Sequence, residues 1–148
     1  MIIELPYRAY FSDTSFWIAS INPKDKNHQK AKQFYYLMLK KSDSIYTTID
    51  VISETITTLR YIRIFGFHLA KRSIEKIRPH LLVRYPTKDD YHRVQDLYLK
   101  YAKNKEISFY DLVSYVIVKE RLNDIPCLSF DSDFKRLGLN VLDLSRIL

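Results

Sequence analysis

Short stretches rich in β-branched and aromatic residues alternate with helical stretches along the whole 148-residue chain. This alternation is typical of a parallel sheet with helices on both faces, because parallel strands need crossover connections. Strands are expected at residues 9–12, 45–49, 81–85, 126–130 and 141–142. Helices are expected around 16–18, over 28–41, from 50 onward, over 68–78, from 88 onward, over 112–118 and over 131–137. Right-handed crossovers place the carboxyl ends of the strands along one edge, where such sheets bind ligands.

Several classes of protein are excluded by residues that are scarce or missing. The length suits one domain over residues 1–148, with 47% apolar residues to form its core. Only two glycines, Gly66 and Gly138, are present, so a glycine-rich phosphate loop of the Walker or dinucleotide-binding kind cannot be built. A single cysteine, Cys127, excludes an internal disulfide framework and a zinc site made of several cysteines.

The charge of the chain points to an anionic partner. Lysine and arginine number 24 against 17 acidic residues, which gives a net charge of +7. Nucleic acid is the commonest anionic partner of a small basic domain, although the same charge is also explained by solubility alone. The start of the chain lacks the features of a secretory signal, and no apolar stretch approaches a membrane span of roughly 18 residues. A cytoplasmic location without membrane contact is therefore expected.

Acidic residues recur where the expected strands end. Asp13 follows the first strand, Glu54 lies in the helix after the second, and Asp131 follows strand 126–130. Asp111 opens the helix that leads into that strand, and Asp133 comes two residues after Asp131. Carboxylates crowded into one cleft repel each other unless a cation lies among them. Hard oxygen ligands suit Mg²⁺ or Mn²⁺.

A purely structural explanation exists for most of these acids. Asp13, Asp111 and Asp131 all lie at expected helix starts, where an acid caps the helix and complements its dipole. Asp50 and Asp143 lie equally near strand ends, and the pattern alone does not separate them from the first three. Spacing alone therefore defines no reaction.

Four motifs, taken in order, resemble those of PIN-domain nucleases, and the size of the chain is similar to the VapC-like toxin branch. The motifs are Asp13-Thr14-Ser15, Ser53-Glu54, Ser108-Phe109-Tyr110-Asp111-Leu112, and Leu128-Ser129-Phe130-Asp131-Ser132-Asp133-Phe134. Together they span nearly the whole chain. The resemblance implies a three-layer α/β/α sandwich with a central parallel sheet, often forming a homodimer.

The resemblance also implies metal-dependent endonucleolytic cleavage of RNA. Asp13, Glu54, Asp111 and Asp131 would be catalytic and would hold Mg²⁺ or Mn²⁺, with Asp133 as a further metal ligand. The implied partners are the RNA substrate and, for a toxin, a small cognate antitoxin that covers the acidic cleft with a basic residue.

Further residues receive roles that are less specific. Four hydroxyl residues would orient the carboxylates or contact phosphate, or simply cap helices: Thr14, Ser15, Ser108 and Ser129. Four basic residues would carry the RNA backbone, or form an ordinary solvated face: Arg60, Arg63, Lys71 and Arg72. Tyr115 lies one turn after Asp111, where it would narrow the site or stack on a base.

Three alternatives stay open. A metal-dependent phosphatase would also use an aspartate after the first strand, but the haloacid-dehalogenase-like pattern needs Asp-x-Asp, and Ser15 occupies the second position. A PIN fold that binds RNA or protein without catalysis would use the same basic surface. A housekeeping RNA-processing nuclease would use the same acids and have no antitoxin.

Overall fold

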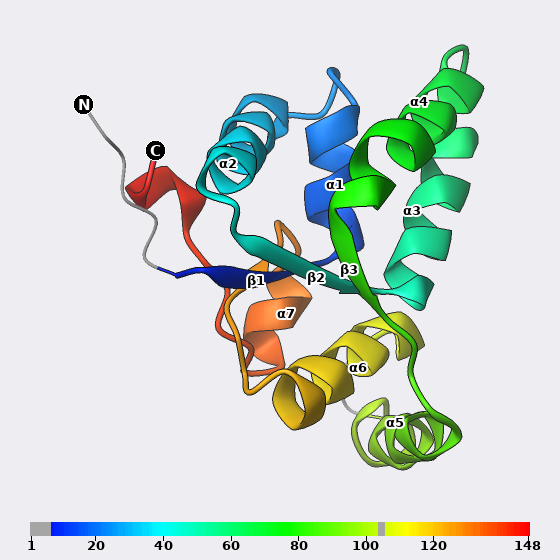
Figure 1. Ribbon diagram of the computed structural model, residues 1–148. Helices are drawn as coiled ribbons and strands as arrows, with labels where there is room; N and C mark the ends of the chain where they lie inside the picture. Colours follow the sequence, from blue (N-terminus) through cyan, green and yellow to red (C-terminus); the bar gives the residue numbers. More distant parts are fainter. Residues whose placement is uncertain (1–6, 104–105) are drawn as a thin grey trace.

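The computed structural model describes residues 7–103 and 106–148 and has a central sheet of four parallel strands (Figure 1). The strands are β1 (Ala9–Ser12), β2 (Ser44–Thr48), β3 (Leu81–Arg84) and β4 (Cys127–Leu128), in the order β3-β2-β1-β4. The chain therefore moves outward from β1 to β3 and then crosses back to β4 on the other side of β1. This reversal opens a crevice at the carboxyl ends of β1 and β4, where ligands bind in sheets of this kind.

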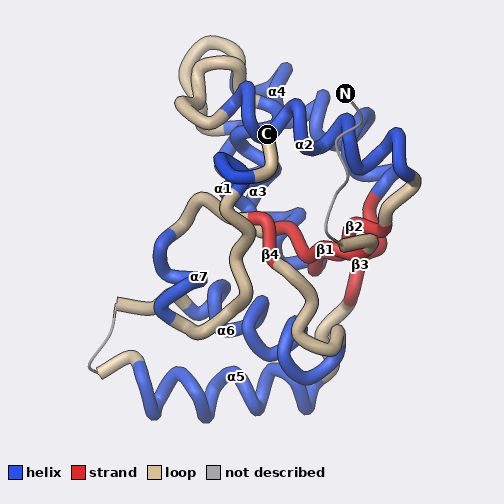
Figure 2. Tube along the Cα trace, turned by 90° about the vertical axis from the view of Figure 1, so that its left-hand side faces the viewer, coloured by secondary structure: helices blue, strands red, loops and turns tan. Residues whose placement is uncertain are grey.

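Helices cover both faces of the sheet, which confirms the expected three-layer α/β/α sandwich. The first four are α1 (Thr14–Ile21), α2 (His28–Lys41), α3 (Ile49–Arg60) and α4 (Gly66–Arg72). The last three are α5 (Lys88–Tyr101), α6 (Phe109–Val116) and α7 (Ser132–Arg136). Figures 1 and 2 show α1 to α4 above the sheet and α5 to α7 below it. No helix of the described residues is long and apolar enough to cross a membrane.

Two hydrophobic cores hold these layers together. The larger one packs α1 to α4 against the sheet through fully buried aromatic side chains, among them Tyr10, Phe16 and Phe34. The Phe34 ring meets the Tyr10 ring edge-on at a centroid distance of 5.4 Å. The smaller core lies between α5 and α6, around Val94 and Val113. Because α6 carries Asp111, the smaller core positions one of the predicted site residues.

The structure differs from the sequence-based expectation at three elements. The expected strand 126–130 pairs only over Cys127–Leu128, because the N–H groups of the next residues bond to side chains of the crevice. The expected strand 141–142 forms a single bridge, between Val141 and Cys127. The expected helix 68–78 begins at Gly66, where close approach to the Arg60 carbonyl leaves no room for a Cβ atom. After α4 the chain widens into a π-helical turn, η1 (Ser73–Ile77).

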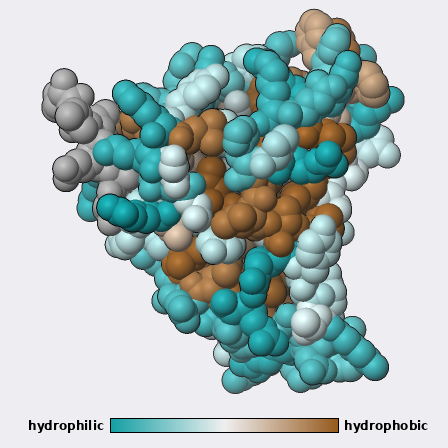
Figure 3. Space-filling model, in the orientation of Figure 1, coloured by the Kyte–Doolittle hydropathy of each residue, from teal (hydrophilic) through white to brown (hydrophobic). Residues whose placement is uncertain are grey.

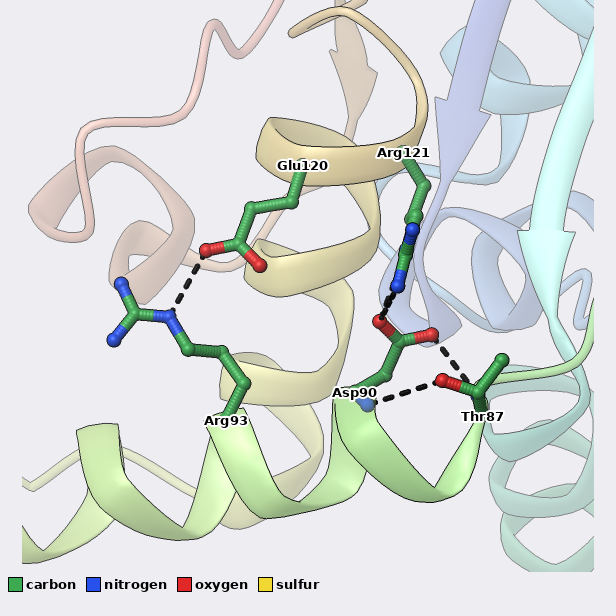
Figure 4. Close-up of polar contacts among 5 residues, drawn as sticks. All are labelled: Thr87, Asp90, Arg93, Glu120 and Arg121. Atoms are coloured by element: carbon green, nitrogen blue, oxygen red, sulfur yellow. Dashed lines mark hydrogen bonds and ion pairs between the residues drawn. The ribbon is translucent and has the colours of Figure 1, made fainter.

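The N-terminal turn of α5 is fixed to the segment that follows α6, the π-helical turn η3 (Ile117–Arg121). Figure 4 shows Asp90 between its two partners, Thr87 and Arg121. One oxygen of Asp90 accepts from the Thr87 backbone N–H at 2.9 Å, and the other accepts from Arg121 at 2.8 and 3.0 Å. The Thr87 hydroxyl in turn accepts from the Asp90 N–H, which completes a capping box at the start of α5.

Asp90→Asn is expected to lower the free energy of unfolding by about 1–2 kcal/mol at neutral pH, because the side chain is buried and its charge is bonded twice. Burial alone would raise the pKa of Asp90, but hydrogen bonds from Thr87 and Arg121 outweigh it and lower the pKa. The stability supplied by this carboxylate is therefore present above its ordinary pKa and is lost as the pH falls through the lowered value. Urea unfolding at neutral pH and at about pH 3 measures both effects.

The control for this prediction is Glu120→Gln. Glu120 pairs with Arg93 at 3.0 Å on the same two elements, but their side chains are 40% and 51% exposed. Exposed pairs contribute little, so the control should change stability much less. Equal losses in the two variants, or a loss for Asp90→Asn that does not shrink in acid, would contradict the assignment.

Candidate active site

A cleft of about 190 Å³ opens where the carboxyl ends of β1 and β2 meet the starts of α6 and α7. Among the described residues, its acidic lining side chains are Asp13, Asp50, Glu54, Asp111 and Asp131. Thr14, Ser15, Tyr110 and Ser114 also line it. The four acids predicted to be catalytic therefore come together in one cleft from four separate elements.

Asp13 is the most buried of these acids, with 5% of its surface exposed. It caps α1 by accepting from the Phe16 N–H at 3.1 Å. The same carboxylate accepts from the Ser15 hydroxyl at 2.8 Å and from the Ser129 hydroxyl at 2.6 Å. Burial raises the pKa of Asp13 to about 7, against the lowering effect of these three donors. Asp13 is thus both a helix cap and a carboxyl group whose pKa lies near neutral pH.

Two serine hydroxyls orient Asp13 and tie β1 to the segment after β4. Ser15 Oγ accepts from the Phe130 N–H at 2.8 Å, and Ser129 Oγ accepts from the Asp131 N–H at 3.0 Å. Because backbone N–H groups occupy lone pairs of both oxygens, the single proton of each hydroxyl is free to point at Asp13. These two predicted residues thus hold a carboxylate in place.

Asp111, Asp131 and Asp133 present one carboxylate oxygen each, and these oxygens lie within 4.8 Å of one another. Asp131 caps α7 by accepting from the Asp133 N–H at 2.9 Å. Burial, and next the charge of Asp131, raise the pKa of Asp111 to about 6. Arg136 pairs with Asp133 at 3.0 Å and offsets part of the negative charge.

Glu54 faces this group from α3. Burial raises the pKa of Glu54, a hydrogen bond from Thr14 lowers it, and the charge of Asp131 raises it again. The charge of Asp131 thus raises the pKa of Asp13, Glu54 and Asp111 alike. The acids act on one another across the cleft, as the sequence analysis expected of carboxylates at one sheet edge.

Other predicted residues lie elsewhere. Ser108 is the N-cap of α6, where its hydroxyl accepts from the Asp111 N–H at 3.1 Å. The four predicted RNA-binding residues do not line the cleft; all are exposed on the segment from the end of α3 to the end of α4: Arg60, Arg63, Lys71 and Arg72. Their role in binding RNA stays a prediction.

The expectation that Tyr115 narrows the site is wrong. Its side chain is partly buried between the two hydrophobic cores, and the cleft is lined instead by Ser114 and Tyr110 on the same helix. Tyr91, a residue that was not predicted at the site, donates from its hydroxyl to both oxygens of Asp50 at 2.9 Å. The two residues are 41 positions apart, so no local pattern signals this contact.

The donor set of the cleft fits a hard divalent cation. Among the residues that the structure describes, the charged groups lining the cleft are all carboxylates, which are ligands that Mg²⁺ and Mn²⁺ accept. The raised pKa values of Asp13, Glu54 and Asp111 show that ionised forms are disfavoured in the protein alone. A cation among them would remove this penalty. Asp111, Asp131 and Asp133 are the residues whose oxygens are grouped closely enough to share one ion.

The protein thus combines a parallel α/β/α sandwich with a cluster of carboxylates at the point where the strand order reverses. Such an acidic cluster is suited to binding a metal ion. The PIN domain family matches residues 10–139, and the chain belongs to that family. No curated protein matches the sequence in a direct comparison.

Solved structures with the same fold cover most of the chain. VapC20 of Mycobacterium tuberculosis, described as a sarcin-ricin loop cleaving toxin, is 27% identical with a TM-score of 0.71, over 88% of this chain and 95% of its own. FitAcB of Neisseria gonorrhoeae is 14% identical with a TM-score of 0.64, over 92% and 98%. VapBC2 of Rickettsia felis, bound to a DNA fragment from its promoter, is 14% identical with a TM-score of 0.64, over 91% and 97%.

Ser129→Ala is expected to raise the pKa of Asp13 above about 7, because it removes the shortest hydrogen bond to the ionised form. The pKa can be measured from the carboxyl ¹³C shift of Asp13 during an NMR titration. Ser53→Ala is the matched control, since Ser53 is exposed and its hydroxyl bonds the Ile49 carbonyl within α3. An unchanged Asp13 titration in Ser129→Ala would show that this hydroxyl does not stabilise the charge.

Proposed function

We propose that the protein is a metal-dependent endoribonuclease and the toxin of a toxin–antitoxin pair. The observation that carries the proposal is the convergence of Asp13, Glu54, Asp111 and Asp131 on one cleft. Membership of the PIN family and the similarity to the RNA-cleaving toxin VapC20 support the same reaction class. The net charge of +7 supports an anionic substrate, because the acidic cleft leaves the rest of the molecule more basic still.

In this proposal the ligands of Mg²⁺ or Mn²⁺ are Asp13, Glu54, Asp111, Asp131 and Asp133. When bound, the cation supplies an activated water and positive charge for the leaving oxygen. Ser15 and Ser129 keep the Asp13 carboxylate in one orientation, so it need not reorganise when substrate arrives. Thr14, at the start of α1, lines the cleft with Glu54 and lowers the pKa of that carboxyl.

We further propose a small antitoxin as a protein partner, with RNA degradation taking place in the cytoplasm. The antitoxin would neutralise the acidic cleft with a basic side chain. Apolar surface for its attachment gathers on the face in Figure 3, and Leu82 on the edge strand β3 is 46% exposed. A groove of about 440 Å³ between α3 and the segment formed by α4 and η1 is lined by Ile56, Phe67 and Ile74. The same surface would serve a homodimer. An antitoxin and a second copy of the chain are distinguished by measuring the mass of the protein alone and after mixing with the product of a neighbouring short reading frame.

Asp111→Asn is expected to reduce Mn²⁺-dependent RNA cleavage at least about 100-fold. The substitution removes one of the three carboxylates, Asp111, Asp131 and Asp133, whose oxygens lie close enough to share one ion. Cleavage of a sarcin–ricin stem-loop and of an unstructured RNA is followed on gels, with and without EDTA. Circular dichroism confirms that the fold is kept.

Asp96→Asn is the matched control, since Asp96 is exposed on α5 and does not line the cleft. It should cleave like the wild type. RNA binding by the wild type without cleavage of either RNA would contradict the proposal and favour a binding module.

A further inference from the structure

A second groove adjoins the acidic cleft. It has a volume of about 270 Å³ and is lined by residues of α2, of α7 and of the 3₁₀ turn η4 (Leu144–Arg146). Asp131 lines both the groove and the cleft. Ser129 also lines the groove, and its hydroxyl donates to Asp13 in the cleft at 2.6 Å. The two hollows are therefore neighbours, with residues 129–131 between them.

Two lysines line this second groove, hereafter the lysine groove: Lys30 from α2 and Lys135 from α7. Both are exposed, and within residues 7–103 and 106–148 neither forms an ion pair. Lys30 Nζ donates to the Ser145 hydroxyl at 2.9 Å, which leaves two of its three protons for another acceptor. The groove thus offers two ammonium groups to a ligand.

Among the described residues, the acids that line the lysine groove are engaged elsewhere. Asp143 accepts from the Ser145 N–H at 3.1 Å and pairs with Arg146 at 3.3 Å. Asp131 belongs to the three grouped carboxylates of the cleft, so a cation bound there would also offset its charge. The uncompensated charge of the groove is therefore that of its two lysines.

This charge suits the phosphates of an RNA strand. The phosphates on either side of the cleaved one must lie close to the acidic cleft, where unneutralised carboxylates repel them. The lysine groove is next to the cleft, and lysine binds phosphate as a point charge. The exposed Ser132 hydroxyl adds an uncharged donor of the kind that contacts phosphate and sugar oxygens.

We infer that the lysine groove binds the sugar-phosphate backbone of the RNA strand beside the cleaved phosphate, with Lys30 and Lys135 as phosphate ligands. This inference rests on the proposed RNA-cleaving function and gives the strand a defined path away from the cleft. The path differs from that of the four basic residues predicted from the sequence, which do not line the cleft: Arg60, Arg63, Lys71 and Arg72.

The test measures how RNA affinity depends on salt. A labelled, unstructured RNA is titrated by fluorescence anisotropy between about 0.05 and 0.5 M KCl, in Ca²⁺ without Mg²⁺ or Mn²⁺. Each phosphate contact to a single strand contributes about 0.7 to the slope of log affinity against log salt. The double variant Lys30→Gln, Lys135→Gln should therefore lower the slope by about 1.4 and the affinity at 0.1 M salt about tenfold. Glutamine keeps a donor for Ser145 and removes only the charge.

The double variant Lys32→Gln, Lys40→Gln is the matched control. It removes the same two charges from exposed positions on α2 that line neither the cleft nor the lysine groove. Because the net charge changes equally, a difference between the two double variants reports the groove itself. The control should change the slope by less than about 0.3. The double variant Arg63→Gln, Lys71→Gln tests the alternative path along α4 and should also leave the slope nearly unchanged.

Cleavage kinetics in Mn²⁺ supply a second readout. The groove variant should raise KM about tenfold and keep kcat within about twofold, because the lysines bind substrate and transition state alike. An unchanged slope in the groove variant would overturn the inference, as would an equal loss in the matched control. A loss of slope only in Arg63→Gln, Lys71→Gln would overturn it in favour of the other path. RNA binding that depends on both groove lysines, without cleavage in Mg²⁺ or Mn²⁺, would leave the inference standing and refute the nuclease proposal alone.

Discussion

Ionised carboxylates in a confined cleft repel one another. The residues around the acidic cleft are arranged to hold these carboxylates in place against that repulsion. Asp13 is held by Ser15 and Ser129, which come from either side of the sheet's central crevice. The hydrogen bonds that stabilise its charge are the same bonds that draw the segment after β4 toward β1. Hydrogen bonds therefore hold together a group of acids whose charges repel one another, which is a common feature of functional sites.

The rest of the architecture follows from the need to bring these acids to one place. Parallel pairing gathers the carboxyl ends of β1, β2 and β4; the middle of α3 supplies Glu54, and the starts of α6 and α7 supply Asp111 and Asp131. The smaller hydrophobic core fixes α6 against α5, and with it Asp111. Asp90, bonded by Thr87 and Arg121, then fixes the start of α5, from which the Tyr91 hydroxyl bonds Asp50.

The sequence was a good guide wherever a local rule applied. Asp13 and Asp131 could be placed because each follows an expected strand and precedes an expected helix, and in the structure each caps a helix and lines the cleft. The capping box at Thr87 and the N-cap at Ser108 were also readable from short patterns. In these cases the backbone position of a residue already decides where its side chain points.

What could not be predicted depends on packing between distant segments. The expected strand 126–130 is cut short because Phe130 and Asp131 donate to serine side chains rather than to a neighbouring strand. Tyr115 and Tyr110 lie on one helix, and only the packing of α6 between two cores decides that Tyr110 faces the cleft. The Tyr91 contact with Asp50 likewise requires that α5 and α3 meet in space.

The central claim is that the clustered carboxylates hold a divalent cation. Its most direct test is a crystal soaked in Mn²⁺ and measured at a wavelength where manganese scatters anomalously. The account predicts an anomalous peak within coordination distance of Asp111, Asp131 and Asp133, about 2.0–2.6 Å from their oxygens. A cleft without such a peak at saturating Mn²⁺, or a peak only at acids elsewhere on the surface, would contradict it.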